Sequence, residues 1–262
     1  MIDKFRALHA GRILVLPNAW DVASARLIEQ AGAAAIATTS AGVAWSLGVP
    51  DGDRLSRDRA VDLVSRVVSA VTVPVTADIE AGFGATAAEV GDTVRAVADA
   101  GAAGVNIEDC LHPGPGLREI PDQVERLAAA RAAAPLFINA RIDTYLSAVG
   151  DPANRLADTV TRARAFLDAG ADGVFVPGVG DPELIAALAS QVDAPLNVLG
   201  YPGALPVPKL AELGVARVSV GARIALAAYA LATRCATETL TAGTYDAMTT
   251  DLTHDDLNTL LA

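Results

Sequence analysis

The sequence is poor in cysteine, lysine and aromatic residues. Its two cysteines, Cys110 and Cys235, lie far apart among 262 residues, so they offer neither a disulfide framework nor the paired cysteines of a zinc site. We therefore expect a reducing, cytoplasmic location. The only lysines are Lys4, at the N-terminus, and Lys209, at a predicted helix start. No lysine is placed to form a Schiff base inside the protein, which argues against a lysine-dependent aldolase.

Positive charge is also scarce. The chain has 20 Lys plus Arg against 31 Asp plus Glu, a formal net charge of -11, which argues against nucleic acid or an anionic membrane surface as partner. The first six residues lack the apolar run of a signal peptide. The uncharged run 31–50 consists of small and turn residues rather than those of a membrane span, so we interpret it as a strand followed by a loop.

What the sequence has is a repeated strand and helix pattern. Four helical patterns end in a glycine suited to the left-handed C-cap conformation, and each is followed by a hydrophobic strand; these glycines are Gly32, Gly101, Gly170 and Gly214. Other strands start around a proline that follows a helix. The predicted strands lie at 13–16, 34–39, 104–108, 173–177 and 217–220, and three more start at 73, 134 and 194.

Amphipathic helical segments separate these strands. They span 22–30, 57–70, 87–100, 123–133, 153–169, 182–189, 208–213 and 222–240. Eight strands alternating with eight helices predict a parallel (β/α)8 TIM barrel over about 12–242, within a single domain 1–262. A doubly wound open sheet is the alternative. The C-terminal tail, 243–262, contains a further predicted helix at 245–261 that has no strand to pair with, so it packs outside the barrel or on a neighbouring subunit.

Carboxylates stand at the ends of two consecutive predicted strands. Asp78 and Glu80 follow one strand, and Glu108 and Asp109 follow the next. In a barrel these residues meet at the carboxyl ends of the strands, where burying them together costs several kcal/mol unless a cation neutralises them. Oxygen ligands without a nearby His or Cys cluster favour Mg2+, with Mn2+ as a substitute, over zinc.

Other polar residues are predicted at the same end of the barrel. Arg141 is the only arginine there, and its guanidinium would bind a carboxylate or phosphate through two hydrogen bonds. The small residues Thr39, Ser40, Ala41 and Gly42 offer backbone N–H groups to a second anionic oxygen. This combination suits a 2-oxo acid on the metal, whose enolate would be stabilised during cleavage or decarboxylation.

Several of these residues also have plain structural interpretations. Asp21, Asp51 and Asp143 could equally cap helices or turns. His112, in the loop after the Glu108 strand, could be a general acid or base, but a solvated loop histidine is the stronger interpretation. Cys110 is typical of a small buried residue rather than a nucleophile.

Four motifs, taken in order, resemble the isocitrate lyase/phosphoenolpyruvate mutase superfamily over about 5–230. They are the segments 47–51, ending in Asp51; 78–84, starting at Asp78; 107–109; and 139–141, ending in Arg141. The resemblance implies a barrel that is usually a tetramer with its last helices exchanged between subunits. It also implies Mg2+ held by Asp78, Glu80 and Glu108, partly through water, with Asp51 close to those waters. The turn Thr39 to Gly42 and Arg141 would bind the 2-oxo acid, and Asn197 matches a substrate-side position.

The sequence departs from both main branches of that superfamily. The loop at 110–119 lacks the Lys-Lys/Arg-Cys-Gly-His motif of the isocitrate and methylisocitrate lyases, and Gly178 stands where they have a glutamate. It also lacks the lysine and asparagine of the phosphonate enzymes. We therefore predict a Mg2+-dependent carbon-carbon lyase or decarboxylase that acts on a small 2-oxo or 2-hydroxy dicarboxylate through a metal-bound enolate. A phosphonopyruvate-type mutase or hydrolase and a non-catalytic 2-oxo acid binding protein are the alternatives.

Overall fold

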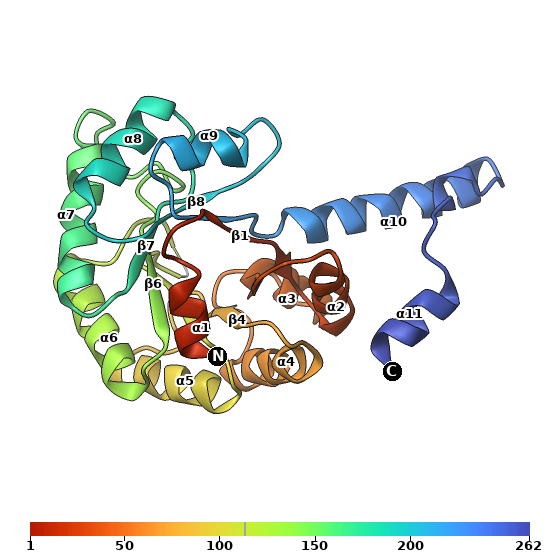
Figure 1. Cartoon of the computed structure of the whole chain (residues 1–262), viewed down its shortest axis with the longest axis horizontal. Coiled ribbons are helices and arrows are strands. Elements are labelled where there is room, and N and C mark those ends of the chain that lie inside the picture. Colours follow the sequence, from red (N-terminus) through yellow and green to blue (C-terminus); the bar gives the residue numbers. More distant parts are fainter. Residues whose placement is uncertain (113) are drawn as a thin grey trace.

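The computed structural model describes residues 1–112 and 114–262 and contains one parallel sheet rolled into a barrel (Figure 1). Neighbouring strands follow the order β1-β9-β8-β7-β6-β5-β4-β3-β2. The strands are β1 Leu14–Leu16, β2 Asn18–Ala19, β3 Ile36–Thr38, β4 Val75–Asp78, β5 Gly104–Glu108, β6 Phe137–Arg141, β7 Gly173–Phe175, β8 Leu196–Leu199 and β9 Arg217–Ser219. This architecture confirms the predicted (β/α)8 barrel.

The first predicted strand is divided in two. Pro17, which has no N–H to donate, separates β1 from β2. β1 pairs with β9 and β2 pairs with β3, so the two segments together occupy one position in the barrel wall and nearly close it. Nine strand segments therefore occupy eight positions.

Helices surround the sheet (Figure 1). They are α1 Ile2–Ala7, α2 Val22–Gln30, α3 Ser40–Ser46, α4 Arg57–Ala70, α5 Ala87–Asp99, α6 Ile120–Ala133, α7 Arg155–Asp168, α8 Pro182–Gln191, α9 Val207–Glu212, α10 Arg223–Thr241 and α11 His254–Leu261, with a 3-10 helix at Asp246–Met248. The four predicted C-cap glycines all have positive φ, between 88° and 106°. Asp21 proves to be the N-cap of α2, because its carboxylate accepts a hydrogen bond from Ser24 N at 2.7 Å.

Three segments differ from the sequence prediction. The run 40–46, expected to be loop, forms α3. Residues 2–7 form the unpredicted helix α1, whose Phe5 is fully buried with its ring centroid 5.5 Å from that of Phe137, at the start of β6. α1 therefore covers the amino end of the barrel. The predicted tail helix 245–261 is broken into the 3-10 helix and α11, which Thr253 caps.

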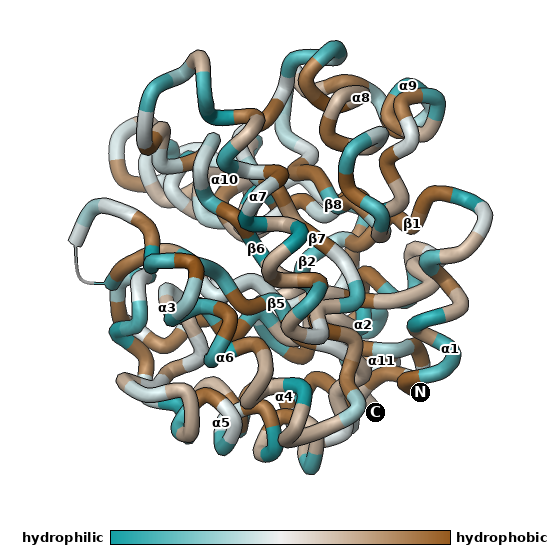
Figure 2. The backbone as a smooth tube through the Cα atoms, turned by 90° about the vertical axis from the view of Figure 1, so that its left-hand side faces the viewer, coloured by the Kyte–Doolittle hydropathy of each residue, from teal (hydrophilic) through white to brown (hydrophobic). Residues whose placement is uncertain are grey.

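Along β5, side chains that pack in the hydrophobic core alternate with side chains that point into the barrel. Val105 and Ile107 are buried in the main hydrophobic cluster with helix residues such as Val94 and Leu127, whereas Asn106 and Glu108 alternate with them. Since successive side chains of a strand point to opposite faces, Asn106 and Glu108 point into the barrel. Figure 2 shows hydrophilic residues gathered in the outer turns and connecting loops.

The C-terminal elements leave the barrel. α10, 19 residues long, extends away from it as an arm (Figure 1), and of its side chains only Ala225 is buried. The arm exposes large apolar side chains, among them Leu226, Tyr229 and Leu231. α11 returns to α2, where Arg26 Nε donates to Leu260 O at 2.9 Å. Within the described residues, no helix combines the length and apolar character that crossing a membrane requires.

Candidate active site at the carboxyl ends of the strands

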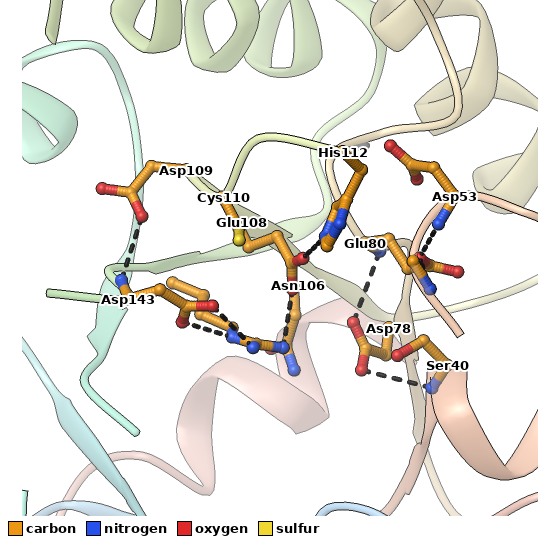
Figure 3. Close-up of polar contacts among 12 residues, drawn as sticks. Ser40, Asp53, Asp78, Glu80, Asn106, Glu108, Asp109, Cys110, His112 and Asp143 are labelled. Atoms are coloured by element: carbon orange, nitrogen blue, oxygen red, sulfur yellow. Dashed lines mark hydrogen bonds and ion pairs between the residues drawn. The ribbon is translucent and has the colours of Figure 1, made fainter. Parts of the chain in front are cut away.

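Three neighbouring strands deliver charged side chains to one end of the barrel. Asp78 ends β4, Glu108 ends β5 and Arg141 ends β6. Glu108 and Arg141 are register partners across the β5–β6 pair, and Asp78 is paired with Asn106 across β4–β5. Residues that are far apart in the chain are therefore held side by side by the backbone ladder, as Figure 3 shows for the residues that it labels.

Glu108 lies between two cationic groups. Its Oε1 is 2.7 Å from His112 Nε2, and its Oε2 is 2.6 Å from Arg141 Nη1. Only 4% of Glu108 is exposed, and this burial raises the pKa of its carboxyl although Arg141 and His112 oppose the shift. The two partners therefore fix the orientation of the Glu108 side chain, but their positive charge does not fully offset the cost of burying its carboxylate.

A second carboxylate holds the guanidinium of Arg141. Asp143 accepts hydrogen bonds from its Nε and Nη2, both at 2.7 Å. Asp143 N in turn donates to Asp109 Oδ1 at 2.9 Å, and Arg162 Nη1 lies 3.2 Å from Asp109 Oδ2. Burial raises the pKa of Asp109 to about 7. Since a guanidinium has five N–H groups, donors remain on Nη1 and Nη2 for a ligand.

Glu80 is held in an unusual backbone conformation. Its φ is +51°, a left-handed value that costs a residue with a side chain of order 1 kcal/mol or more, and nearby Asp53 and Phe83 share it. Glu80 Oε2 accepts hydrogen bonds from Gly52 N, at 3.1 Å, and from Asp53 N. Burial, followed by the charges of neighbouring carboxylates, raises the pKa of Glu80 to about 8.

Asp78 contacts the predicted anion-binding turn. Its Oδ2 accepts from Ser40 N at 3.3 Å, and its own N–H donates to Thr38 Oγ1 at 2.9 Å. Thr39 precedes α3, and Ser40, Ala41 and Gly42 form its first turn, so this segment is the start of a helix rather than an open turn. A side chain at Gly42 would lie within 2.9 Å of Thr39 and Trp20, so glycine is needed there for close packing.

The two remaining predicted site residues, Asp51 and Asn197, have different surroundings. Asp51 lies at the rim, and its crowded surroundings, together with the charge of Asp78, raise its pKa. Asn197 is fully buried inside the barrel, where its Nδ2 donates to Val198 O at 2.8 Å and to Ser219 Oγ at 3.2 Å. Its predicted contact with substrate stays a prediction.

His112 was predicted to be a solvated loop residue, and this interpretation is wrong. Its side chain is 22% exposed and bonds to Glu108, and hydrogen bonding with Cys110 and then Glu108 raises its pKa to about 10. Within the part of the chain that the structure describes, Glu108, Cys110 and His112 are the only three potential metal-binding side chains whose donor atoms all lie within 4.8 Å of one another. The alternate spacing of these residues, directly after a strand end, is the sequence signal that could have revealed them. Pro113, in the same loop, lies outside the described residues.

The oxygen donors at this end of the barrel fit a divalent cation. Asp78, Glu80 and Glu108 come from adjacent strand ends, and the exposed Asp51 is close enough to Asp78 to feel its charge. Reduced hydration and the charges of neighbouring carboxylates raise the pKa values of Asp51 and Glu80, which is the condition that a bound cation would relieve. The donor set is the kind that hard cations prefer.

Comparison with known proteins identifies an uncharacterised relative, a lyase and a decarboxylase. The chain is 41% identical over 220 residues to an uncharacterised protein of Mycobacterium tuberculosis (strain ATCC 25618 / H37Rv), covering 81% of this chain and 79% of that protein. It is 31% identical over 227 residues to 2-methylisocitrate lyase of Salmonella typhimurium, covering 82% and 75%. It is 34% identical over 206 residues to oxaloacetate decarboxylase of Paraburkholderia xenovorans, covering 74% and 67%.

Solved structures and a family model agree with these relatives. A Burkholderia cenocepacia J2315 structure described as a lyase/mutase matches with a TM-score of 0.91 and 40% identity, covering 98% of this chain and 95% of that one. Phosphonopyruvate hydrolase in complex with oxalate and Mg2+ matches with a TM-score of 0.87 and 26% identity, covering 98% and 93%. The phosphoenolpyruvate phosphomutase family model matches residues 5–240. The chain therefore belongs to the phosphoenolpyruvate phosphomutase family, in agreement with the resemblance that its motifs predicted.

Proposed function

We propose that this protein is a Mg2+-dependent carbon-carbon lyase or decarboxylase in the cytoplasm, acting on a small 2-oxo or 2-hydroxy dicarboxylate through an enolate. The observation that carries the proposal is the arrangement at three adjacent strand ends. A buried glutamate, Glu108, is paired with Arg141 beside the acidic residues Asp78 and Glu80. One strongly held cationic side chain within a group of carboxylates suits a substrate that is anionic and chelating.

Asp78, Glu80 and Glu108 would hold the cation. Their oxygens do not form a group within 4.8 Å of one another among the described residues, which supports ligation partly through water, as Mg2+ prefers. When bound, the cation supplies positive charge against the negative charge that develops on the substrate's 2-oxo oxygen. Asp51, at the rim, would accept hydrogen bonds from the intervening waters. Mn2+ would substitute.

Arg141 and the first turn of α3 would orient the substrate. Asp143 fixes the plane of the guanidinium through two 2.7 Å hydrogen bonds, so its free N–H groups have a defined direction before substrate binds. The backbone N–H groups within Thr39 to Gly42 would donate to a second anionic oxygen of the same 2-oxo acid. Because Ser40 N already contacts Asp78, substrate and carboxylate would lie next to each other.

A neighbouring cleft of about 500 Å³ would take the second half of the substrate. It is lined by residues that include Asp53, His112, Arg118 and Arg126. Two arginines and a histidine at its wall support a second carboxylate rather than an apolar group. This is why we favour a dicarboxylate over a simple 2-oxo acid.

The exposed arm supports an oligomer. We propose a homotetramer in which α10 and α11 pack on neighbouring subunits, because the arm exposes Leu240 (85%) and the segment that follows it exposes Tyr245 (65%). Light scattering should give four times the chain mass, and a chain ending at residue 242 should give a smaller assembly. A monomeric full-length protein would contradict this part of the proposal.

A phosphonopyruvate-type reaction is the second candidate, since phosphonopyruvate hydrolase is among the structural matches. Against it, the only lysines, Lys4 in α1 and Lys209 in α9, are both outside the strand ends. The third candidate, a non-catalytic 2-oxo acid binding protein, would bind oxalate or 2-oxoglutarate tightly without turning over any diacid.

Turnover of a substrate panel with Mg2+ or with EDTA tests the proposal. The panel consists of oxaloacetate, methylisocitrate, isocitrate, a 2-alkylmalate and phosphonopyruvate, each followed by release of pyruvate or glyoxylate. We expect metal-dependent pyruvate release from one of the diacids. Turnover of phosphonopyruvate alone would favour the second candidate, and silence across the panel, with oxalate raising the Tm only in Mg2+, would favour the third.

A further inference from the structure

A second set of donor atoms lies beside the proposed magnesium ligands. Glu108, Cys110 and His112 occupy alternate positions as the chain leaves β5. Their carboxylate, thiol and imidazole donor atoms all lie within 4.8 Å of one another, and Figure 3 shows the three side chains pointing toward one another. Cys110 has no role in the proposed reaction, and His112 enters it only through the wall of the neighbouring cleft.

The chemistry of these donors differs from that of a magnesium site. Thiolate and imidazole ligands select Zn2+ and related transition metals, whereas Mg2+ requires oxygen ligands in an octahedron. Three protein ligands of mixed type, with a fourth position left open, form the usual arrangement of an accessible zinc site. Cys110 and His112 are both only half-buried, and His112 lines the neighbouring cleft, so an ion can reach this group of donors.

The surrounding backbone holds the donors in place. Cys110 forms an isolated antiparallel bridge with Leu117, Leu111 N donates to Gly116 O at 3.0 Å, and Arg118 N donates to Asp109 O at 2.7 Å. A side chain at Gly52 would lie 3.3 Å from His112 Nδ1, so the imidazole packs against that glycine with its Nε2 toward Glu108. A site whose ligands are fixed before binding loses less conformational entropy when it closes on an ion.

We propose that Glu108, Cys110 and His112 form a binding site for Zn2+ that overlaps the proposed magnesium site through their shared ligand Glu108. On binding, the thiol and the imidazolium release their protons to solvent, so the ion replaces protons in this cluster. Glu108 would turn from Arg141 toward the zinc ion and would be lost to Mg2+. Zinc would therefore inhibit the enzyme. This inhibition rests on the proposed function, whereas the existence of the site does not.

Cobalt titration of the metal-free full-length protein tests the site directly. Co2+ is the probe, because a thiolate bound to it gives an intense near-ultraviolet charge-transfer band that oxygen ligands do not give. We expect this band in the wild-type protein and its loss on adding Zn2+. Cys110→Ser should abolish it, and His112→Gln should weaken cobalt binding by about tenfold or more. The matched controls Cys235→Ser and His254→Gln should keep it.

Two outcomes would overturn the proposed site: absence of the band in the wild-type protein, or its persistence in Cys110→Ser. Circular dichroism and thermal unfolding of each variant show whether it is folded, and Cys110→Ala is a second variant should the serine protein unfold. In the activity arm, Zn2+ should inhibit Mg2+-dependent turnover of wild-type and Cys235→Ser proteins, with Cys110→Ser about tenfold or more less sensitive. If Zn2+ inhibits the Cys110→Ser protein as strongly as the wild-type protein, the proposed competition between Zn2+ and Mg2+ is wrong. If no substrate is turned over, the proposed function fails while the cobalt spectrum still decides the site.

Discussion

Polar side chains are buried in two neighbouring regions of the barrel, the mouth at the carboxyl ends of the strands and the layer directly beneath it. Their hydrogen bonds are satisfied in different ways. At the mouth, Glu80 and Glu108 are almost fully buried and have raised pKa values. Beneath it, three buried amides bond to one another: Asn139 Nδ2 donates to Asn106 Oδ1 at 2.9 Å and to Asn197 Oδ1 at 3.2 Å. Amides carry both donors and acceptors, so they can satisfy one another, whereas carboxylates can only accept.

This difference suggests different roles for the two regions of the barrel. The amides of this layer bond to one another and to neighbouring groups of the chain, which suits a structural role. The carboxylates at the mouth need positive charge from outside the chain, which suits a binding role. Arg217 is a partial exception in the layer. Its Nη2 donates to Asn106 Oδ1 at 3.2 Å, but within the described residues its Nε and Nη1 have no partner, and burial lowers its pKa to about 9.

The largest expected effect comes from Asp78 at the mouth. Asp78→Asn keeps the size of the side chain but removes a charge from the proposed cation site, so turnover should fall by about 10³-fold or more. The free energy of unfolding without metal should stay level or rise, because repulsion between carboxylates is relieved. Steady-state kinetics and urea unfolding measure both. Near-normal turnover would remove Asp78 from the catalytic machinery.

In the amide layer we expect a substitution to lower stability more than it lowers turnover. Asn139→Leu removes one hydrogen bond each from the oxygens of Asn106 and Asn197, which keep Arg217 Nη2 and Ser219 Oγ as donors, so the free energy of unfolding should fall by about 1–3 kcal/mol. Turnover of the folded fraction should fall by less than about tenfold, because Asn139 is not among the residues proposed to contact the substrate. Gln191→Leu, which replaces an exposed amide at the end of α8, is the control and should change stability by less than about 0.5 kcal/mol. A catalytic loss as large as that of Asp78→Asn would place the layer in the active site.

The smallest expected effect is a pH dependence of stability that arises at the mouth. Glu80 has a pKa of about 8 in the folded protein against 4.5 for its ordinary value, so between these values the folded form binds more protons than the unfolded form. In EDTA, the Glu80 contribution to the free energy of unfolding should therefore decrease as pH rises from about 4.5 to 8, by roughly 1–3 kcal/mol.

Urea unfolding across this pH window measures the effect. Saturating Mg2+ should flatten the slope, because a bound cation stabilises the ionised carboxylate, and Glu80→Gln should flatten it in EDTA as well. A wild-type slope that is unchanged by Mg2+ would show that Glu80 does not sense the cation.

Local pattern was enough to predict the barrel and the charged residues at the carboxyl ends of its strands. The apolar strands, the glycine C-caps such as Gly101 and the proline-led strands are each specified by residues close together in the chain. Parallel topology then brings all carboxyl ends to one side, so the positions of Asp78, Glu108 and Arg141 followed from strand ends alone.

Contacts between loops and across strands were decided only by the tertiary structure. The clamp of Asp143 on Arg141, the contact of His112 with Glu108 and the burial of Asn197 depend on strand register and on the path by which loops return over the mouth. Local sequence does not encode the partner of such a side chain, since one loop histidine can face water or a carboxylate with the same neighbours in the chain. By itself the sequence determined which charged residues gather at the carboxyl ends of the strands; the fold decided which of these charges meet, because pairing energies depend on distances that the whole barrel sets.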